Sequence, residues 1–230
     1  MLYSGKDLRK LIIPLIIEQI LAIAVGMADT IMVSAAGEAA VSGVSLVDTV
    51  NILLINVFSA LATGGAVVSG HFLGKKKRED ACKSAWQILL FATLLALVIS
   101  VIFITAHDPL LRLMFGKIED DVMKASKTYL IITTYSFVAL AIYNSCAALF
   151  RAMNESKVTM WVSLLMNVIN VVGNAICIYG LHMGVAGVAI PTTISRYVAA
   201  VVIFLLMFQP KKEINLCGQI TWKFNGGVVN

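Results

Sequence analysis

Apolar residues fill six long segments of this chain, and short polar or glycine-rich stretches separate them. The segments cover about residues 11–36, 44–73, 84–106, 125–149, 158–181 and 185–208. Each is long enough to cross a membrane as an α-helix, which requires about 20 apolar residues. A helix also satisfies its own backbone hydrogen bonds in lipid. The pattern therefore predicts an all-α integral membrane protein, with six transmembrane helices over residues 1–210 and a cytoplasmic tail, or the start of an inter-lobe linker, over 211–230.

The composition agrees with a membrane protein and excludes several other classes. Hydrophobic residues make up 59% of the chain and charged residues only 13%, whereas soluble domains carry about 25% charged residues. The net charge of +5 comes from basic residues outside the apolar segments, without interleaved aromatics, so it does not indicate a nucleic-acid partner. The four cysteines are scattered and have no zinc-binding spacing.

The distribution of lysine and arginine predicts the orientation. The N-terminus, the second and fourth polar stretches and the tail together hold most of the basic residues. The opposite side holds only four of them, namely Arg112, Lys117, Lys124 and Lys127. By the positive-inside rule, both termini are expected in the cytoplasm.

Asp29 is the most informative polar residue, because it lies deep within the first apolar segment. A carboxylate there costs roughly 2.5–3.5 kcal/mol on insertion, which indicates a functional role such as binding a proton or a cation. Asn174 and Thr192 lie at the same depth, roughly 9–12 Å below the external ends of their segments, and Asn170 lies one turn deeper. Carboxylate, amide and hydroxyl oxygens suit a hard cation such as Na⁺, or a proton network. The alternative is that the amides and hydroxyl only join helices.

Five further residues have two readings each. Glu18 is expected to reach the interface or a water-filled cavity, and Tyr129 either reaches the level of Asp29 or belongs to an interfacial aromatic belt. Pro14 either bends the first helix or lies harmlessly in its first turn. Asp48 is expected to be interfacial or capping, and Arg196 to form a structural ion pair or to reach the interface.

Small residues in the second segment predict close helix packing. The pattern Gly70-x-x-x-Gly74 is the main example, and Gly184 and Gly187 are expected to serve the same purpose.

Several separated motifs resemble the N-terminal half of a multidrug and toxic compound extrusion (MATE) transporter, in its bacterial NorM-like branch. The motifs are Pro14-Leu-Ile-Ile-Glu-Gln19, Gly26-Met-Ala-Asp29-Thr-Ile-Met-Val33, Leu149-Phe-Arg-Ala-Met-Asn-Glu-Ser156, Asn167-Val-Ile-Asn170-Val-Val-Gly-Asn174 and Gly184-Val-Ala-Gly-Val-Ala-Ile-Pro-Thr192. The resemblance implies a twelve-helix protein of two six-helix lobes in the bacterial inner membrane. It also implies an antiporter that exchanges Na⁺ or H⁺ for organic, often cationic, drugs.

The resemblance further assigns roles to individual residues. Asp29 matches the family's cation-linked aspartate, and Asn170, Asn174 and Thr192 match its polar partners. Tyr129 matches a tyrosine of the fourth helix, and the first-helix proline tied to bending matches Pro14. Some family members have an aspartate where this chain has Asn174, so the site here carries one negative charge fewer.

Only one six-helix block is present, and no internal repeat is found. Because many transporters bind substrate between two such repeats, the expected partner is a second lobe or a second copy, besides drug substrates and membrane lipid. The chain is expected to be a fragment, a truncated product or a half-size protein. It is not expected to be an enzyme or to hold a cofactor other than the coupling ion. A lipid-linked oligosaccharide flippase and a non-transporting membrane scaffold are the alternatives.

Overall fold

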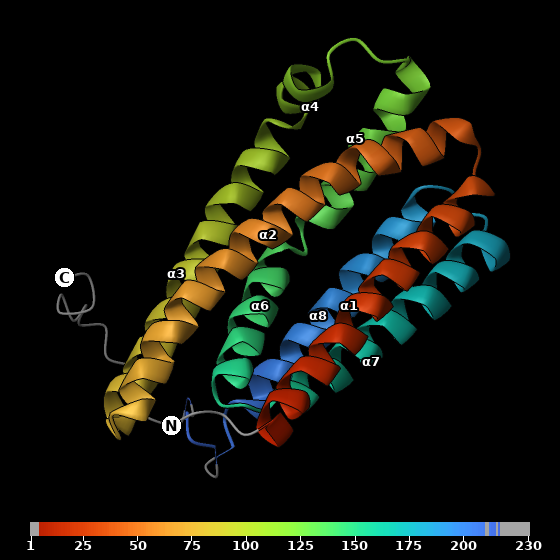
Figure 1. Cartoon of the computed structure of the whole chain (residues 1–230). Helices are drawn as coiled ribbons and strands as arrows, with labels where there is room; N and C mark the ends of the chain where they lie inside the picture. Colours follow the sequence, from red (N-terminus) through yellow and green to blue (C-terminus); the bar gives the residue numbers. More distant parts are fainter. Residues whose placement is uncertain (1–4, 210–211, 215, 217–230) are drawn as a thin grey trace.

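The computed structural model describes residues 5–209, 212–214 and 216. Eight α-helices and one π-helical turn make up this part of the chain (Figure 1). In chain order they are α1 (Gly5–Ser34), α2 (Glu38–Gly74), α3 (Arg78–Thr105), α4 (His107–Phe115), α5 (Asp120–Thr134), α6 (Phe137–Ala152), α7 (Ser156–Ala175), η1 (Ile176–Gly180) and α8 (Ala186–Leu206). Most of the predicted tail over 211–230 lies outside the described residues.

Five of these helices are long and apolar enough to cross a membrane, and a sixth span results if α5 and α6 are counted together. The two are bent by 52° at Tyr135 and Ser136. The fourth apolar segment is therefore divided, which the sequence pattern did not predict. The short helix α4 was not predicted either, since residues 107–121 were expected to be a polar break.

Side chains of neighbouring helices satisfy the backbone at the break between α5 and α6. The Thr193 hydroxyl of α8 donates to the carbonyl of Ile132 at 3.1 Å, and the Tyr197 hydroxyl donates to that of Tyr135 at 2.8 Å. From α3, the Ser100 hydroxyl lies 3.4 Å from the Thr134 carbonyl. Such partners are what permits an interrupted helix at membrane depth.

The helices pack as two groups around α6. On one side α2 packs against α3, α5 and α6, and on the other α7 pairs with α8, which also contacts α6 (Figure 1). The turn between α1 and α2 at Gly37 marks one end of the bundle, called here the Gly37 end, and the turn after α2 marks the other, the Gly74 end.

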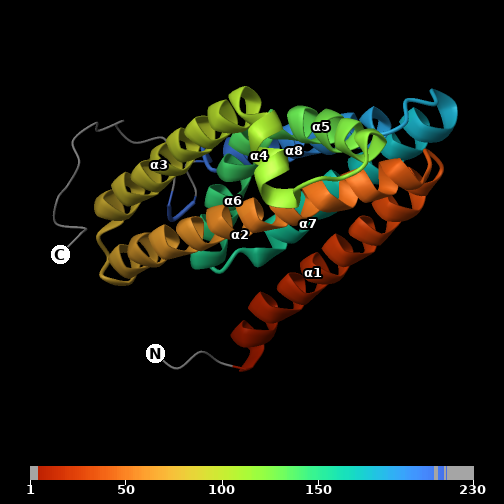
Figure 2. The same cartoon turned by 90° about the horizontal axis from the view of Figure 1, so that it is seen from above.

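Helix α1 is the least covered span of the lobe. It packs mainly along α7 and diverges from α2 toward its own N-terminus (Figure 2). Only 6% of its most apolar 18-residue stretch is buried within the lobe, against 44% of the corresponding stretch of α8. Pro14 lies in the interior of α1 rather than in its first turn, so it removes a backbone hydrogen bond within a continuous helix.

The tightest glycine contacts of α2 differ from the predicted one. A Cβ at Gly65 would collide with Ile88 Cγ1 of α3. A Cβ at Gly43 would lie 2.7 Å from the Cβ of Ala125, so α2 and α5 touch closely there. At Gly70 a Cβ would make an ordinary contact of 3.7 Å with Ala152, and at Gly74 it would meet nothing within 4 Å. Gly70-x-x-x-Gly74 is therefore not a tight packing motif in this lobe.

Candidate cation site and its neighbouring charges

A continuous chain of hydrogen bonds joins the four residues that were predicted at matching depth. The Asn174 amide nitrogen on α7 donates to Asp29 Oδ1 on α1 at 2.6 Å, and it lies 3.3 Å from Asn170 Oδ1. The Asn170 amide in turn donates to Thr192 Oγ1 on α8 at 2.9 Å. Three helices thus meet through these side chains near the Gly37 end, which we call the Asp29 chain.

Helix geometry explains how these side chains meet. Asn170 and Asn174 are one turn apart on α7, so they share a face. Gly173, which precedes Asn174, lets α7 approach α8 closely. A Cβ at Gly173 would lie 2.7 Å from the Cβ of Pro191, which precedes Thr192. Immediately after α7 the chain widens into the π-helical turn η1, a type of distortion that is frequent at functional sites.

The Asp29 chain leaves one buried oxygen without a partner. Asn170, Asn174 and Thr192 are 4%, 0% and 7% exposed. The Asn174 amide nitrogen serves two acceptors, whereas its Oδ1 accepts no hydrogen bond from the described residues. A buried unpaired acceptor is rare and calls for a donor or a cation. The Asp29 carboxylate and the Asn174 oxygen are oxygen ligands of the kind that a hard cation takes.

A second polar cluster surrounds Asp48 on α2. The Tyr129 hydroxyl of α5 donates to Asp48 Oδ1 at 3.0 Å, and the Asn51 amide lies 3.3 Å from the same oxygen. Tyr129 therefore does not hydrogen-bond to Asp29 and is no interfacial belt residue, since it is 2% exposed. Asp48 is also not a helix cap, because it lies ten residues inside α2.

Arg196 of α8 reaches the break between α5 and α6. Its guanidinium donates to the Ser136 hydroxyl at the break between α5 and α6, at 2.9 Å. No carboxylate among the described residues lies within 4.0 Å of it, so the predicted direct ion pair is absent from that part of the chain.

Glu18 forms a separate cluster toward the Gly74 end. Its carboxylate accepts from Arg151 at 2.9 Å, from the Thr159 hydroxyl at 3.2 Å and from the Tyr143 hydroxyl at 3.4 Å. These contacts give Glu18 three protein partners, and its side chain remains 15% exposed. Arg151, which counted as a loop cation in the sequence, is the partner of Glu18 and lies in the last turn of α6.

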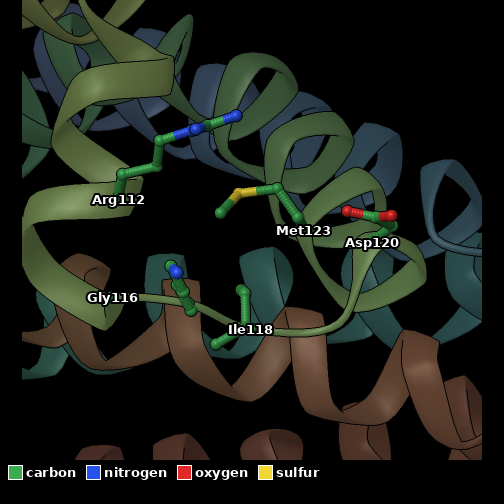
Figure 3. A pocket seen from close by; sticks show the side chains of 6 residues that line it. Arg112, Gly116, Ile118, Asp120 and Met123 are labelled. Atoms are coloured by element: carbon green, nitrogen blue, oxygen red, sulfur yellow. The ribbon is translucent and has the colours of Figure 1, made fainter.

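A surface hollow of about 450 Å³ lies between α4 and the start of α5 (Figure 3). Arg112 and Asp120 border it on different sides, with Met123 and Ile118 between them. At the same end Lys127 hydrogen-bonds the exposed Asp108 and lowers the pKa of that carboxyl. None of these residues contributes to the Asp29 chain. No group of three or more His, Cys, Asp or Glu that could hold a metal is found among the described residues.

Counting residues from the turns grouped the four members of the Asp29 chain. It did not predict the contacts of Asp48 with Asn51 or of Arg196 with Ser136. One signal was available: Asp48 and Arg196 are opposite charges, each about ten residues from the Gly37 end of its helix, and hence at similar depth.

Comparisons with known proteins identify the family of the chain. The MatE family model matches residues 14–176. The chain is 31% identical over 199 residues to the uncharacterized transporter YisQ of Bacillus subtilis, covering 84% of this chain and 43% of that protein. It is 26% identical over 215 residues to the probable multidrug resistance protein NorM of Thermotoga maritima, covering 92% and 46%.

Solved structures share the fold. The chain superposes with a TM-score of 0.89 on the outward-facing conformation of a multidrug resistance MATE family transporter, at 22% identity, covering 97% of this chain and 49% of that one. It matches a MATE in the bent conformation with a TM-score of 0.87 at 21% identity, covering 98% of this chain and 50% of that one. It matches a MATE in the straight conformation with the same TM-score at 22% identity, covering 97% of this chain and 49% of that one. The chain thus spans about half the length of the relatives it matches, which corresponds to one lobe.

Proposed function

Because the chain belongs to the MatE family, we propose that it forms one lobe of a cation-coupled antiporter that exports organic, often cationic, drugs. The coupling cation is Na⁺ or H⁺, and Asp29 is the residue that binds it. The probable multidrug resistance proteins among the relatives support the substrate class.

One observation carries the proposal: the intramembrane carboxylate of Asp29 is the end of a hydrogen-bond chain that contains a buried, unpartnered oxygen on Asn174. A cation or proton at Asp29 neutralises the carboxylate. The hydrogen bond from Asn174 is then no longer strengthened by a charged acceptor. Since α1 packs mainly on α7 and is the least covered span of the lobe, cation binding then changes how α1 packs on α7. Drug and cation exclude each other if they favour different positions of α1, and exchange follows by linkage.

The proposal includes an orientation and a partner. With both termini in the cytoplasm, the Gly37 end faces outward and the Asp29 chain lies in the outer half of the membrane. A second six-helix lobe, or a second copy of this chain, closes the substrate cavity, as in transporters built from paired repeats.

Uptake of ethidium or norfloxacin into everted membrane vesicles that contain the complete transporter, which corresponds to efflux from the cell, tests the proposal. We expect Asp29→Asn to slow coupled efflux by about tenfold or more, because the side chain no longer exchanges a charge. The matched control is Asp108→Asn, which removes an exposed carboxylate at the same end of the lobe and should leave efflux unchanged. Replacing the Na⁺ gradient by a pH gradient identifies the cation. Undiminished drug transport by Asp29→Asn would contradict the proposal.

A further inference from the structure

The buried face of α7 is polar along most of its length. Seven residues of this helix are buried, and only Val162 among them is apolar. The six polar ones, called here the α7 ladder, follow one another at steps of three or four residues. They are Ser156, Thr159, Ser163, Asn167, Asn170 and Asn174. Exposed apolar side chains such as Trp161 and Val168 form the lipid-facing side of the same helix. Because buried polar groups are costly in a membrane lobe, the ladder requires a physical reason.

The ladder joins the two carboxylates of α1. At one end Asn174 donates to Asp29 at 2.6 Å, and at the other the Thr159 hydroxyl donates to Glu18 Oε2 at 3.2 Å. Helices α1 and α7 pack side by side between these contacts (Figure 1). The ladder therefore runs inside the lobe from the Asp29 chain toward the Gly74 end.

The Glu18 end of the ladder lies next to a surface hollow. Arg151, the ion-pair partner of Glu18, lines a hollow of about 320 Å³ between α2 and α6. Thr63 and Gly70 of α2 line the same hollow. The side chains of Glu18 and Arg151 are 15% and 29% exposed, so this ion pair connects the ladder with the surface.

Hydrogen bonding between helices does not account for the whole ladder. Polar residues that join membrane helices are paired with groups on their neighbours. The amide nitrogen of Asn167 is buried without an acceptor among the described residues, and the hydroxyl of Ser156 and Oδ1 of Asn174 are buried without a partner there. Buried polar groups are normally paired with protein or with water. These atoms therefore indicate partners that the described residues do not supply.

Water fits the spacing of the ladder. Side chains three or four residues apart on a helix lie about 5–6 Å apart. One water molecule with two hydrogen bonds of about 2.8 Å spans that distance. Hydroxyls and amides both donate and accept, so they suit a water at each step.

We infer that the α7 ladder binds a file of water molecules between Asp29 and the hollow beside Arg151, and that the coupling cation leaves Asp29 along this file. The file itself follows from the ladder and its unpartnered atoms. The assignment of the cation to it rests on the proposed function.

Silver ions test the water file, because Ag⁺ is a small monovalent cation that binds thiols. The complete transporter, with its native cysteines replaced by serine, receives Ser163→Cys or Asn167→Cys. Leu165→Cys is the matched control, since Leu165 lies between them on α7 and is 40% exposed on the apolar side. Ag⁺ is added in chloride-free buffer to everted vesicles, which expose the Gly74 end in the proposed orientation.

Thiols that Ag⁺ has not blocked are then counted with a fluorescent maleimide after unfolding. We expect Ag⁺ to block both ladder thiols about tenfold or more faster than the control thiol, because a cation enters hydrocarbon poorly.

Asn167→Leu tests the route of the cation, because it places an apolar side chain of similar size in the middle of the ladder. The maximal rate of ethidium uptake should fall about tenfold or more at an unchanged half-saturating concentration, since cation release and not drug binding is slowed. The Tm should not fall, because the lost amide nitrogen has no acceptor among the described residues. Asn167→Ser keeps a polar group and should transport as the wild type does. Val168→Leu, which faces lipid, is the matched control and should change neither quantity.

Three results would overturn the inference. They are equal Ag⁺ reaction of the ladder thiols and the control thiol, wild-type uptake by Asn167→Leu, and slower uptake by Asn167→Leu together with a lower Tm, which is the result that a packing role gives. If Asn167→Leu does not fold, the silver result alone decides. The proposed function survives all of these if Asp29→Asn still slows transport. Undiminished transport by Asp29→Asn removes the proposed function and the cation route, while the silver result still decides the water file.

Discussion

Gly173 shows how much the Asp29 chain depends on one missing methyl group. This glycine precedes Asn174, and an added Cβ would lie 2.7 Å from Pro191, which precedes Thr192. Gly173→Ala should therefore push α7 and α8 apart and lengthen the Asn170–Thr192 hydrogen bond. We expect a loss of about 1–3 kcal/mol of stability from overpacking, seen as a lower Tm in detergent.

Gly64→Ala is the matched control for Gly173→Ala. Gly64 lies inside α2, and a Cβ there would meet nothing within 4 Å. This substitution should leave the Tm unchanged or raise it slightly, because alanine favours the helix. Equal melting temperatures for both variants would show that the α7–α8 contact tolerates a wider spacing.

The sequence was informative about residues whose depth could be counted. Asp29, Asn170, Asn174 and Thr192 could be grouped because each lies a countable distance from a turn. That Tyr129 pairs with Asp48 instead of Asp29 depends on the rotation of α5 about its axis, which apolar segments of uniform composition do not specify.

At the scale of elements, α1 is held to the lobe at two polar points on one face. Glu18 and Asp29 are three helical turns apart, about 16 Å along the axis, and both contact side chains of α7. Glu18 also binds Arg151 of α6, and the two side chains are only 15% and 29% exposed. Glu18 is thus the attachment that remains when Asp29 loses its charge.

Glu18→Leu should destabilise the lobe more than a surface substitution does. It leaves the Arg151 guanidinium without its carboxylate, and breaking a buried ion pair costs about 3–5 kcal/mol, which is an upper bound for this partly buried pair. The double variant Glu18→Leu/Arg151→Met should recover most of this loss, because no unpaired charge remains. Thermal unfolding of the three proteins checks this, and a double variant less stable than Glu18→Leu would contradict it.

The break between α5 and α6 was beyond prediction for a physical reason. The residues around it, Thr134 to Phe137, include no proline or glycine, which are the usual local causes of a kink. What stabilises the break is a set of donors on α8, at positions 193, 196 and 197. Only the folded lobe brings these donors to the backbone carbonyls of Ile132 and Tyr135 and to the Ser136 hydroxyl.

For the whole molecule, the proposed orientation makes the two ends of the bundle chemically distinguishable. In a background with the four cysteines replaced by serine, Lys117→Cys at the Gly37 end and Lys75→Cys at the Gly74 end place single thiols at exposed positions. A membrane-impermeant maleimide on intact cells should label Lys117→Cys at once and Lys75→Cys only after permeabilisation. The reverse labelling would place both termini outside.

Both attachments of α1 also bear on how the lobe is made. Arg151 follows Glu18 by 133 residues, and Asn174 follows Asp29 by 145. At about 5–20 residues per second, the ribosome synthesises these partners roughly 7 to 29 s after α1. During that interval α1 meets the bilayer with two unpaired carboxylates, each costing roughly 2.5–3.5 kcal/mol. Helix α1 can therefore settle into its final place only after α6 and α7 have been made.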